Sequence, residues 1–118
     1  MKEISCEELK NKIDQKDDFK LVNCLSKAQF RAKHIPGSIN IPITHENIGS
    51  MGSFDKVIIK IVPIDEEVIV YCSDVSCQVS VIAYKRFEKL GYKKISRFSG
   101  GLRRWEDDGF VCAGEMVI

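Results

Sequence analysis

The stretch of sequence that decides the fold is residues 68–91, VIVYCSDVSCQVSVIAYKRFEKLG. Its first four residues form an unbroken apolar run, which is typical of a parallel strand covered on both faces. A polar loop follows, and apolar side chains then recur at helical spacing as far as Leu90. Gly91 supplies the residue type that a left-handed helix end prefers. The stretch therefore predicts a strand, a short loop and an amphipathic helix.

The rest of the chain repeats this alternation of short apolar segments and helical patterns. Residues 57–62 fit either a strand or a helix, and the alternation favours a helix. We expect one domain over residues 1–118 with an α/β fold, in which a mostly parallel central sheet of about five strands carries helices on both faces. The other expected strands are residues 19–25, 39–41 and 94–98, and the other expected helices begin near Ser5, Lys27, Thr44 and Leu102.

Composition narrows the classes of function. The 18 basic and 17 acidic side chains nearly cancel, and no basic cluster is interleaved with aromatic residues, so we expect no nucleic-acid partner. No apolar run approaches the roughly 18–20 residues that a membrane span needs. Acidic residues near the N-terminus stand where a secretory signal would be apolar. These features predict a cytoplasmic protein with no membrane contact.

The chain has five cysteines, at positions 6, 24, 72, 77 and 112. An odd number without an export signal does not favour a disulfide framework, and zinc-ligand spacing is absent. We therefore expect neither a metal nor another cofactor. Cys6, Cys24 and Cys112 are expected to pack as small apolar residues. Cys72 and Cys77 stand apart because they lie close together in one loop.

Cys72 is the candidate catalytic residue. It follows the apolar strand, and in parallel sheets ligands bind beyond the carboxyl ends of the strands. The next helix would present its N-terminal amides and positive dipole end to the sulfur, which favours a thiolate with a lowered pKa. The candidate active-site loop comprises Cys72, Ser73, Asp74, Val75, Ser76, Cys77 and Gln78.

Several short motifs resemble those of one known family, the rhodanese-like domains. They are HIPGSINIP at residues 34–42, Val70-Tyr71-Cys72, Gly91-Tyr92, Gly100-Gly101-Leu102 and Trp105. The resemblance spans about residues 4–112. It implies a parallel sheet flanked by helices, and a Cys72 that accepts sulfane sulfur as a persulfide and passes it to cyanide, a thiol or a protein acceptor. It also implies structural roles for His34, Trp105 and the paired glycines.

The length of the loop bears on the type of reaction. In the family, a six-residue loop goes with sulfur transfer, whereas a loop one residue longer that ends in Arg goes with related phosphatases. The loop from Cys72 to Cys77 has six residues and no Arg. A phosphatase needs that guanidinium to hold the phosphoryl group by paired hydrogen bonds. Sulfur transfer is therefore favoured over phosphoryl transfer.

The chain departs from the family pattern at three places. Cys77 stands where a basic residue is common, Asp74 would repel anionic donors, and Asn23-Cys24-Leu25 replaces the usual Asp-Val-Arg. We therefore expect weak activity with thiosulfate. A small-molecule polysulfide or a persulfide, free or carried on a protein, suits this loop better as the sulfur donor.

Two further interpretations remain open from the sequence. Cys77 could resolve a Cys72 persulfide, which would release sulfide and leave a disulfide, or it could simply pack at the start of the helix. The domain could also be a non-catalytic interaction module, because rhodanese-like domains often keep the fold without activity. The retention of Cys72 at the strand end argues against this last interpretation.

Overall fold

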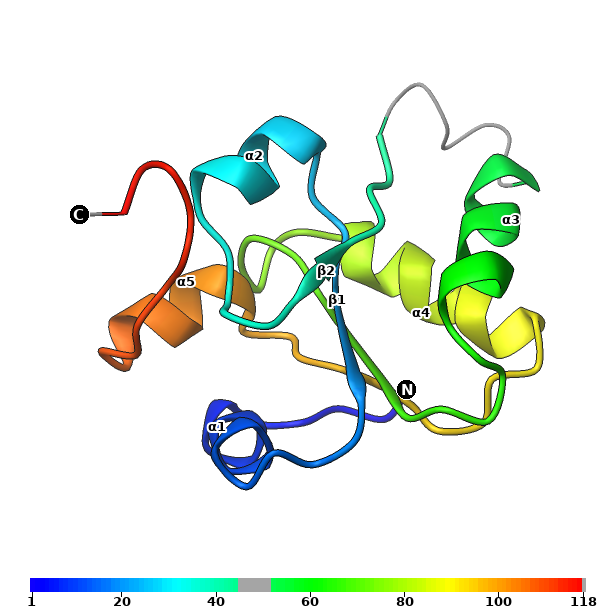
Figure 1. Ribbon diagram of the computed structural model, residues 1–118, viewed down its shortest axis with the longest axis horizontal. Coiled ribbons are helices and arrows are strands. Elements are labelled where there is room, and N and C mark those ends of the chain that lie inside the picture. The colour runs from blue at the N-terminus through cyan, green and yellow to red at the C-terminus, as the bar shows by residue number, and fades with distance from the viewer. Residues whose placement is uncertain (45–51, 118) are drawn as a thin grey trace.

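A parallel four-stranded sheet forms the centre of the computed structural model, which describes residues 1–44 and 52–117 (Figure 1). The strand order is β2-β1-β3-β4, and every neighbouring pair is parallel. The inner strand β3 is buried along its whole length, as its unbroken apolar run predicted. The strands are β1 (Lys20–Asn23), β2 (Ile39–Asn40), β3 (Val68–Tyr71) and β4 (Ile95–Arg97).

Helices cover both faces of this sheet, with α3 and α4 on one side and α1 and α5 on the other (Figure 1). The α/β class with flanking helices is therefore confirmed. The described helices are α1 (Cys6–Asp14), α2 (Lys27–Ala32), α3 (Gly52–Ile61), α4 (Val79–Lys89) and α5 (Gly101–Asp107).

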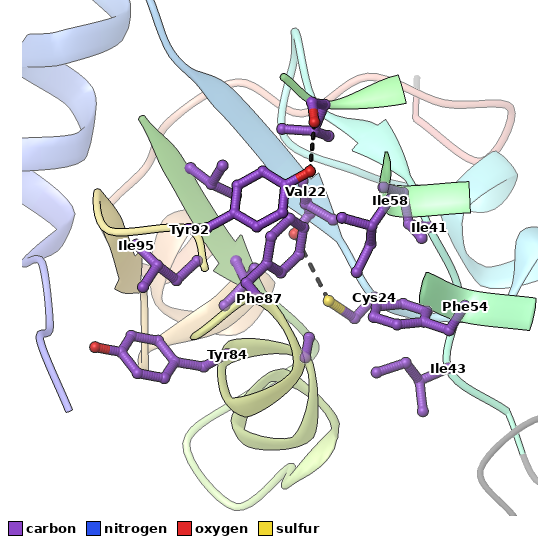
Figure 2. Close-up of a cluster of buried hydrophobic side chains, with 14 residues drawn as sticks. Val22, Cys24, Ile41, Ile43, Phe54, Ile58, Tyr84, Phe87, Tyr92 and Ile95 are labelled. Carbon is purple, nitrogen blue, oxygen red and sulfur yellow. Dashed lines mark hydrogen bonds between the residues drawn. The ribbon is translucent and has the colours of Figure 1, made fainter. Parts of the chain in front are cut away.

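Strand β3 divides the core into two clusters, because successive side chains of a strand point to opposite faces. Val68 and Val70 pack with α3 and α4, and Figure 2 shows this cluster, with Cys24 among its aromatic and branched side chains. Ile69 and Tyr71 pack on the other face with residues of α1 and α5. The strand that leads to Cys72 is thus held from both sides.

The expected count of five strands is wrong for the part of the chain that the structure describes, where the sheet has four. Residues 2–4 run beside β4 and form a single bridge, at Glu3 and Arg97. The Ile4 N–H donates to the Arg97 carbonyl at 3.0 Å. Ser5 then caps α1 through a capping box with Glu8, so the chain turns into a helix before a strand can form.

The bounds of the other expected helices and strands agree with the described structure to within a few residues. Of the ambiguous residues 57–62, all but Val62 belong to a helix, because α3 runs to Ile61 and buries Phe54 and Ile58. The helix expected after Thr44, over residues 45–48, lies outside the described residues. The structure adds a second capping box that the sequence analysis did not identify, between Ser26 and Gln29 at the start of α2.

Candidate functional site: the loop from Cys72 to Gln78

The candidate site is the loop between β3 and α4. Cys72 follows the last residue of β3, and Gln78 is the N-cap of α4 without a side-chain capping hydrogen bond. Because no side chain caps them, the first amides of α4 are available to an anion in the loop. The predicted placement of Cys72, between a strand end and a helix start, is confirmed.

The start of α5 fixes the backbone of this loop. The Leu102 N–H donates to the Cys72 carbonyl at 2.9 Å, and the Arg103 N–H donates to the Ser73 carbonyl at 2.8 Å. Gly101 makes this approach possible, because its φ is +65° and an added Cβ would lie 2.7 Å from the Cys72 carbonyl oxygen. The pair Gly100-Gly101 is therefore the turn that brings α5 against the loop from Cys72 to Gln78.

The Cys72 side chain is almost fully buried, at 1% exposure. Its Sγ lies 3.3 Å from the Ser80 Oγ and 3.5 Å from the Cys77 carbonyl oxygen. Burial raises the pKa of Cys72 to about 11, a hydrogen bond with Cys77 raises it too, and Ser80 opposes the rise. The expected lowering of the Cys72 pKa is therefore wrong, because desolvation at the covered strand end outweighs the nearby helix amides.

Cys77 has the opposite character. Its side chain is only half-buried, and it is a hydrogen-bond partner of the Cys72 thiol. Burial alone would raise the pKa of Cys77, but hydrogen bonds from Cys72, Val79 and Ser73 outweigh it and the pKa is lowered. The two thiols ionise as one coupled pair, and the first negative charge is favoured on Cys77.

The other loop residues form the turn around this pair. The Asp74 carboxylate accepts hydrogen bonds from the Ser76 N–H at 3.0 Å and from the Ser76 hydroxyl at 2.6 Å. These bonds lower the pKa of Asp74, so it is a carboxylate at neutral pH. Val75 is 72% exposed and Gln78 is exposed, so both lie on the outer side of the loop.

Two residues near the sulfur were missed by the sequence analysis. Ser80 is buried on α4, and Arg97 is buried on β4 with its Nε 2.8 Å from the Ser80 Oγ. A signal for each was present in the sequence. Ser80 shares a helical face with Ala83 and Phe87, and Arg97 lies within residues 94–98, which we expected to form a strand.

Searches with the sequence and the structure place this geometry among known proteins. The sequence profile described as the rhodanese-like domain matches residues 5–108. The chain belongs to the rhodanese-like domain family. At the level of the family, this membership points to sulfur transfer. Among curated proteins, no sequence gives a significant match.

Several solved structures share the fold of the described chain. A protein from Bacillus halodurans superposes with a TM-score of 0.81 at 20% identity, covering 98% of this chain and 79% of the other. A rhodanese-related protein from Thermoplasma volcanium superposes with a TM-score of 0.74 at 22% identity, covering 98% of this chain and 100% of the other. An uncharacterized protein from Saccharomyces cerevisiae superposes with a TM-score of 0.75 at 27% identity, covering 92% of this chain and 93% of the other.

The segment that departs from the family pattern after β1 lies beside the thiol pair. Negative charge at Cys72 and Cys77 adds to burial in raising the pKa of Cys24 well above its ordinary value. Asn23 is also buried, and its side chain donates to the Tyr71 hydroxyl at 2.9 Å. In this rhodanese-like domain, the segment supplies the buried Asn23 amide and the buried apolar side chain of Leu25 at the two positions expected to carry an acid and a guanidinium, with the Cys24 thiol between them.

His34 has a packing role, and the described residues offer neither a metal site nor a membrane-spanning helix. The His34 ring stacks on Phe30, with ring centroids 3.9 Å apart, and its Nδ1 lies 2.7 Å from the Phe30 carbonyl oxygen. Within residues 1–44 and 52–117, no group of three or more His, Cys, Asp or Glu side chains could hold a metal ion. No helix in the same residues is long and apolar enough to span a membrane.

Proposed function

We propose that this rhodanese-like domain is a sulfurtransferase that carries sulfane sulfur as a persulfide on Cys72. The observation that supports this most directly is the position of Cys72 at the carboxyl end of the inner strand. There the Ser80 hydroxyl and the Ser80 N–H are both hydrogen-bond partners of its sulfur. Such donors stabilise negative charge on a sulfur that attacks a donor or carries a persulfide anion.

The proposed reaction has two sulfur-transfer steps. Cys72 attacks the outer sulfur of the donor, a new bond forms from the Cys72 Sγ to that sulfur, and the donor leaves as a thiol with the proton of Cys72. Cys77 is placed to relay this proton, because its side chain is a hydrogen-bond partner of Cys72 and its pKa is lowered. An acceptor thiolate or cyanide then attacks the outer sulfur and restores Cys72.

The charges of the loop favour an uncharged or protein-bound donor over thiosulfate. The loop from Cys72 to Gln78 contains no Lys or Arg. Asp74 carries a negative charge there at neutral pH. A dianion such as thiosulfate would meet repulsion without a compensating cation in the loop. A neutral polysulfide, or the persulfide of another protein, avoids this cost, and a protein thiol is an equally suitable acceptor.

Intact-mass measurement after separate incubation with thiosulfate, a polysulfide and a small organic persulfide tests this function. We expect a sulfur adduct of about 32 Da per atom with the last two donors. The adduct should be absent from Cys72→Ser and present in Cys112→Ser, the matched control. Absence of an adduct with every donor, in protein that is folded, would instead support the non-catalytic interaction module.

A second candidate function is sulfide release by the cysteine pair, and the contact between the two thiols favours it. The Cys77 thiolate would attack the Cys72 Sγ of the persulfide, and the outer sulfur would leave as hydrosulfide with the bonding electron pair. The sulfane sulfur is thereby reduced, and the two cysteines are oxidised to a disulfide. An external thiol reductant of low molecular weight would then restore the pair.

The two functions differ in what remains on the protein after loading. Sulfide release predicts one hydrosulfide per chain and a disulfide between Cys72 and Cys77 in the wild type, without an added acceptor. In Cys77→Ser the persulfide should persist, and a sulfide-trapping reagent should detect none. A stable persulfide on the wild-type protein, with no disulfide in its peptide map, would leave simple sulfur transfer as the function.

A further inference from the structure

Arg97 is a buried cation whose ion pair with a carboxylate is long and reaches an exposed side chain. The residue is 8% exposed, and its terminal nitrogen Nη1 lies 3.5 Å from the Oε1 of Glu3, whose side chain is 54% exposed. The shortest hydrogen bond of the guanidinium is instead to a neutral group, the Ser80 hydroxyl, at 2.8 Å. Because burying a guanidinium is costly, this choice of partner needs an explanation.

The geometry links Arg97 to the catalytic sulfur through one hydroxyl. A guanidinium can only donate hydrogen bonds, so the Ser80 Oγ accepts from the Arg97 Nε. The hydroxyl proton of Ser80 is then free to point to another acceptor, and the Cys72 Sγ lies 3.3 Å away. When Cys72 is anionic, the chain of donors runs from Arg97 to Ser80 and from Ser80 to the sulfur.

Arg97 also supports the loop itself. Its Nη2 lies 3.4 Å from the Cys77 carbonyl oxygen, and the same oxygen lies 3.5 Å from the Cys72 Sγ. The positive charge that the loop lacks is thus present below it, on strand β4. Since Arg97 is buried, solvent screens its field at the sulfur only weakly.

We propose that Arg97 and Ser80 are a pair of positioning residues that stabilise negative charge on the Cys72 sulfur from the core side of the loop. In the free protein this charge is the Cys72 thiolate, and in the proposed sulfurtransferase it is the persulfide anion. Only this second role rests on the proposed function. The ionisable groups around the sulfur include Cys77 from the loop, Cys24 from the end of β1 and Arg97 from β4.

Arg97 and Ser80 favour ionisation of Cys72, whereas Cys77 opposes it. A charge on Cys77 opposes a second charge on Cys72, whereas the donor chain from Arg97 favours one. The balance between these two effects decides which sulfur of the pair is the nucleophile. The test therefore uses a Cys77→Ser background, in which Cys72 is the only cysteine of the loop.

The test follows alkylation of Cys72 by iodoacetamide as a function of pH, with peptide mass spectrometry to separate it from the other cysteines. In the Cys77→Ser background, we expect Ser80→Ala to raise the midpoint of the rate–pH profile by about one pH unit. Arg97→Gln should raise it by a similar amount, and Arg97→Lys should recover part of the shift. Combining Ser80→Ala with Arg97→Gln should add little, because the residues act in series.

Matched controls are Ser96→Ala, which removes a buried hydroxyl next to Arg97 on β4, and Arg104→Gln, which removes an exposed guanidinium of α5. Both should leave the midpoint unchanged. If Ser80→Ala is folded and keeps the midpoint of the background protein, or if folded Arg97→Gln keeps it, the proposal is overturned, even if the variant lowers the melting temperature. If the midpoint shifts but no donor loads sulfur onto Cys72, only the proposed function fails.

Discussion

At the scale of single residues, the two cysteines of the loop divide properties that one catalytic cysteine would have to combine. Cys72 has the protected position at the strand end, with the Ser80 hydroxyl 3.3 Å from its sulfur. Cys77 has the solvent exposure and the lowered pKa. A donor molecule that approaches from solvent must therefore reach the Cys72 sulfur past the more exposed Cys77.

The order in which the two thiols react with alkylating reagents follows from these differences. Between pH 7 and 8 we expect iodoacetamide to modify Cys77 before Cys72, because the pKa of Cys77 is lowered and that of Cys72 is raised to about 11. Modification of Cys72 should increase as the pH rises toward 10. Peptide mapping after timed quenching measures both rates, and faster modification of Cys72 at pH 7.5 would contradict the prediction.

The hydroxyl of Tyr71 is a second residue whose effect can be predicted. It accepts from the Asn23 side chain at 2.9 Å and from the Ile35 N–H at 3.0 Å, and it contacts the Ser38 hydroxyl. Tyr71→Phe leaves these buried donors without a partner, so we expect a loss of about 1–3 kcal/mol in the free energy of unfolding.

The matched control for Tyr71→Phe is Tyr84→Phe. Its hydroxyl accepts only a partly buried bond from the Lys2 N–H among the contacts described, at 3.0 Å. Water can replace this partner, so the loss should be less than about 1 kcal/mol. Urea unfolding of both variants gives the comparison, and equal losses would contradict the assigned role of Tyr71.

At the scale of elements, the contact of α5 with the loop from Cys72 to Gln78 depends on one glycine. Gly101→Ala would place a Cβ 2.7 Å from the Cys72 carbonyl oxygen, at a φ of +65° that other residues rarely adopt. We expect a loss of roughly 2 kcal/mol or more in unfolding free energy, together with slower sulfur loading of Cys72. The control is Gly109→Ala, which has a φ of +81° and open space around the added Cβ.

Both glycine variants share the strain of a positive φ, but only Gly101→Ala also introduces a clash with the loop. Chemical denaturation therefore separates the two contributions, and sulfur loading reports whether the loop has moved. If Gly101→Ala and Gly109→Ala lose equal stability and load sulfur equally well, α5 does not position the loop.

The sequence analysis predicted the elements whose patterns are local and left out those that depend on distant contacts. The apolar run of β3, the amphipathic pattern of α4 and the helix start at Ser5 each depend on residues close together in the sequence, and all three are confirmed. The bridge between Glu3 and Arg97 joins residues that lie far apart in the sequence, so no local pattern predicts it.

The same distinction explains how well the candidate site was predicted. The position of Cys72 follows from the strand and the helix next to it in sequence. Its raised pKa follows from complete burial, which depends on Ser80 and on the contact with α5, and a helix-dipole argument alone does not include that burial. The link to Arg97 was missed because a lone arginine in a short strand has no motif.

At the scale of the whole molecule, several buried groups of both core clusters oppose ionisation together. Burial raises the pKa of Cys6 to about 12 and that of Cys72 to about 11, and it also raises the pKa values of Cys24 and Tyr71. Since each pKa is higher in the folded chain, the folded state holds more protons than the unfolded state above about pH 8.5.

Stability should therefore be unaffected by these groups below about pH 8.5 and should decrease as the pH rises toward 11. Melting temperatures measured from pH 7 to pH 11 test this expectation. Cys24→Ala removes the thiol with the deepest burial. The melting temperature of this variant should therefore decrease less steeply with pH than that of the wild type. A flat profile in the wild type up to pH 11 would show that these thiols ionise without unfolding.

The way in which α5 contacts the loop from Cys72 to Gln78 bears on protein engineering. Both of its anchors are main-chain hydrogen bonds, to the carbonyl oxygens of Cys72 and Ser73. A main-chain anchor is indifferent to the side chains that the loop carries, so residues 73–78 can be exchanged for another sequence of equal length without loss of these two bonds. The scaffold is thus suited to libraries in which the loop is randomised and the substrate is chosen by selection.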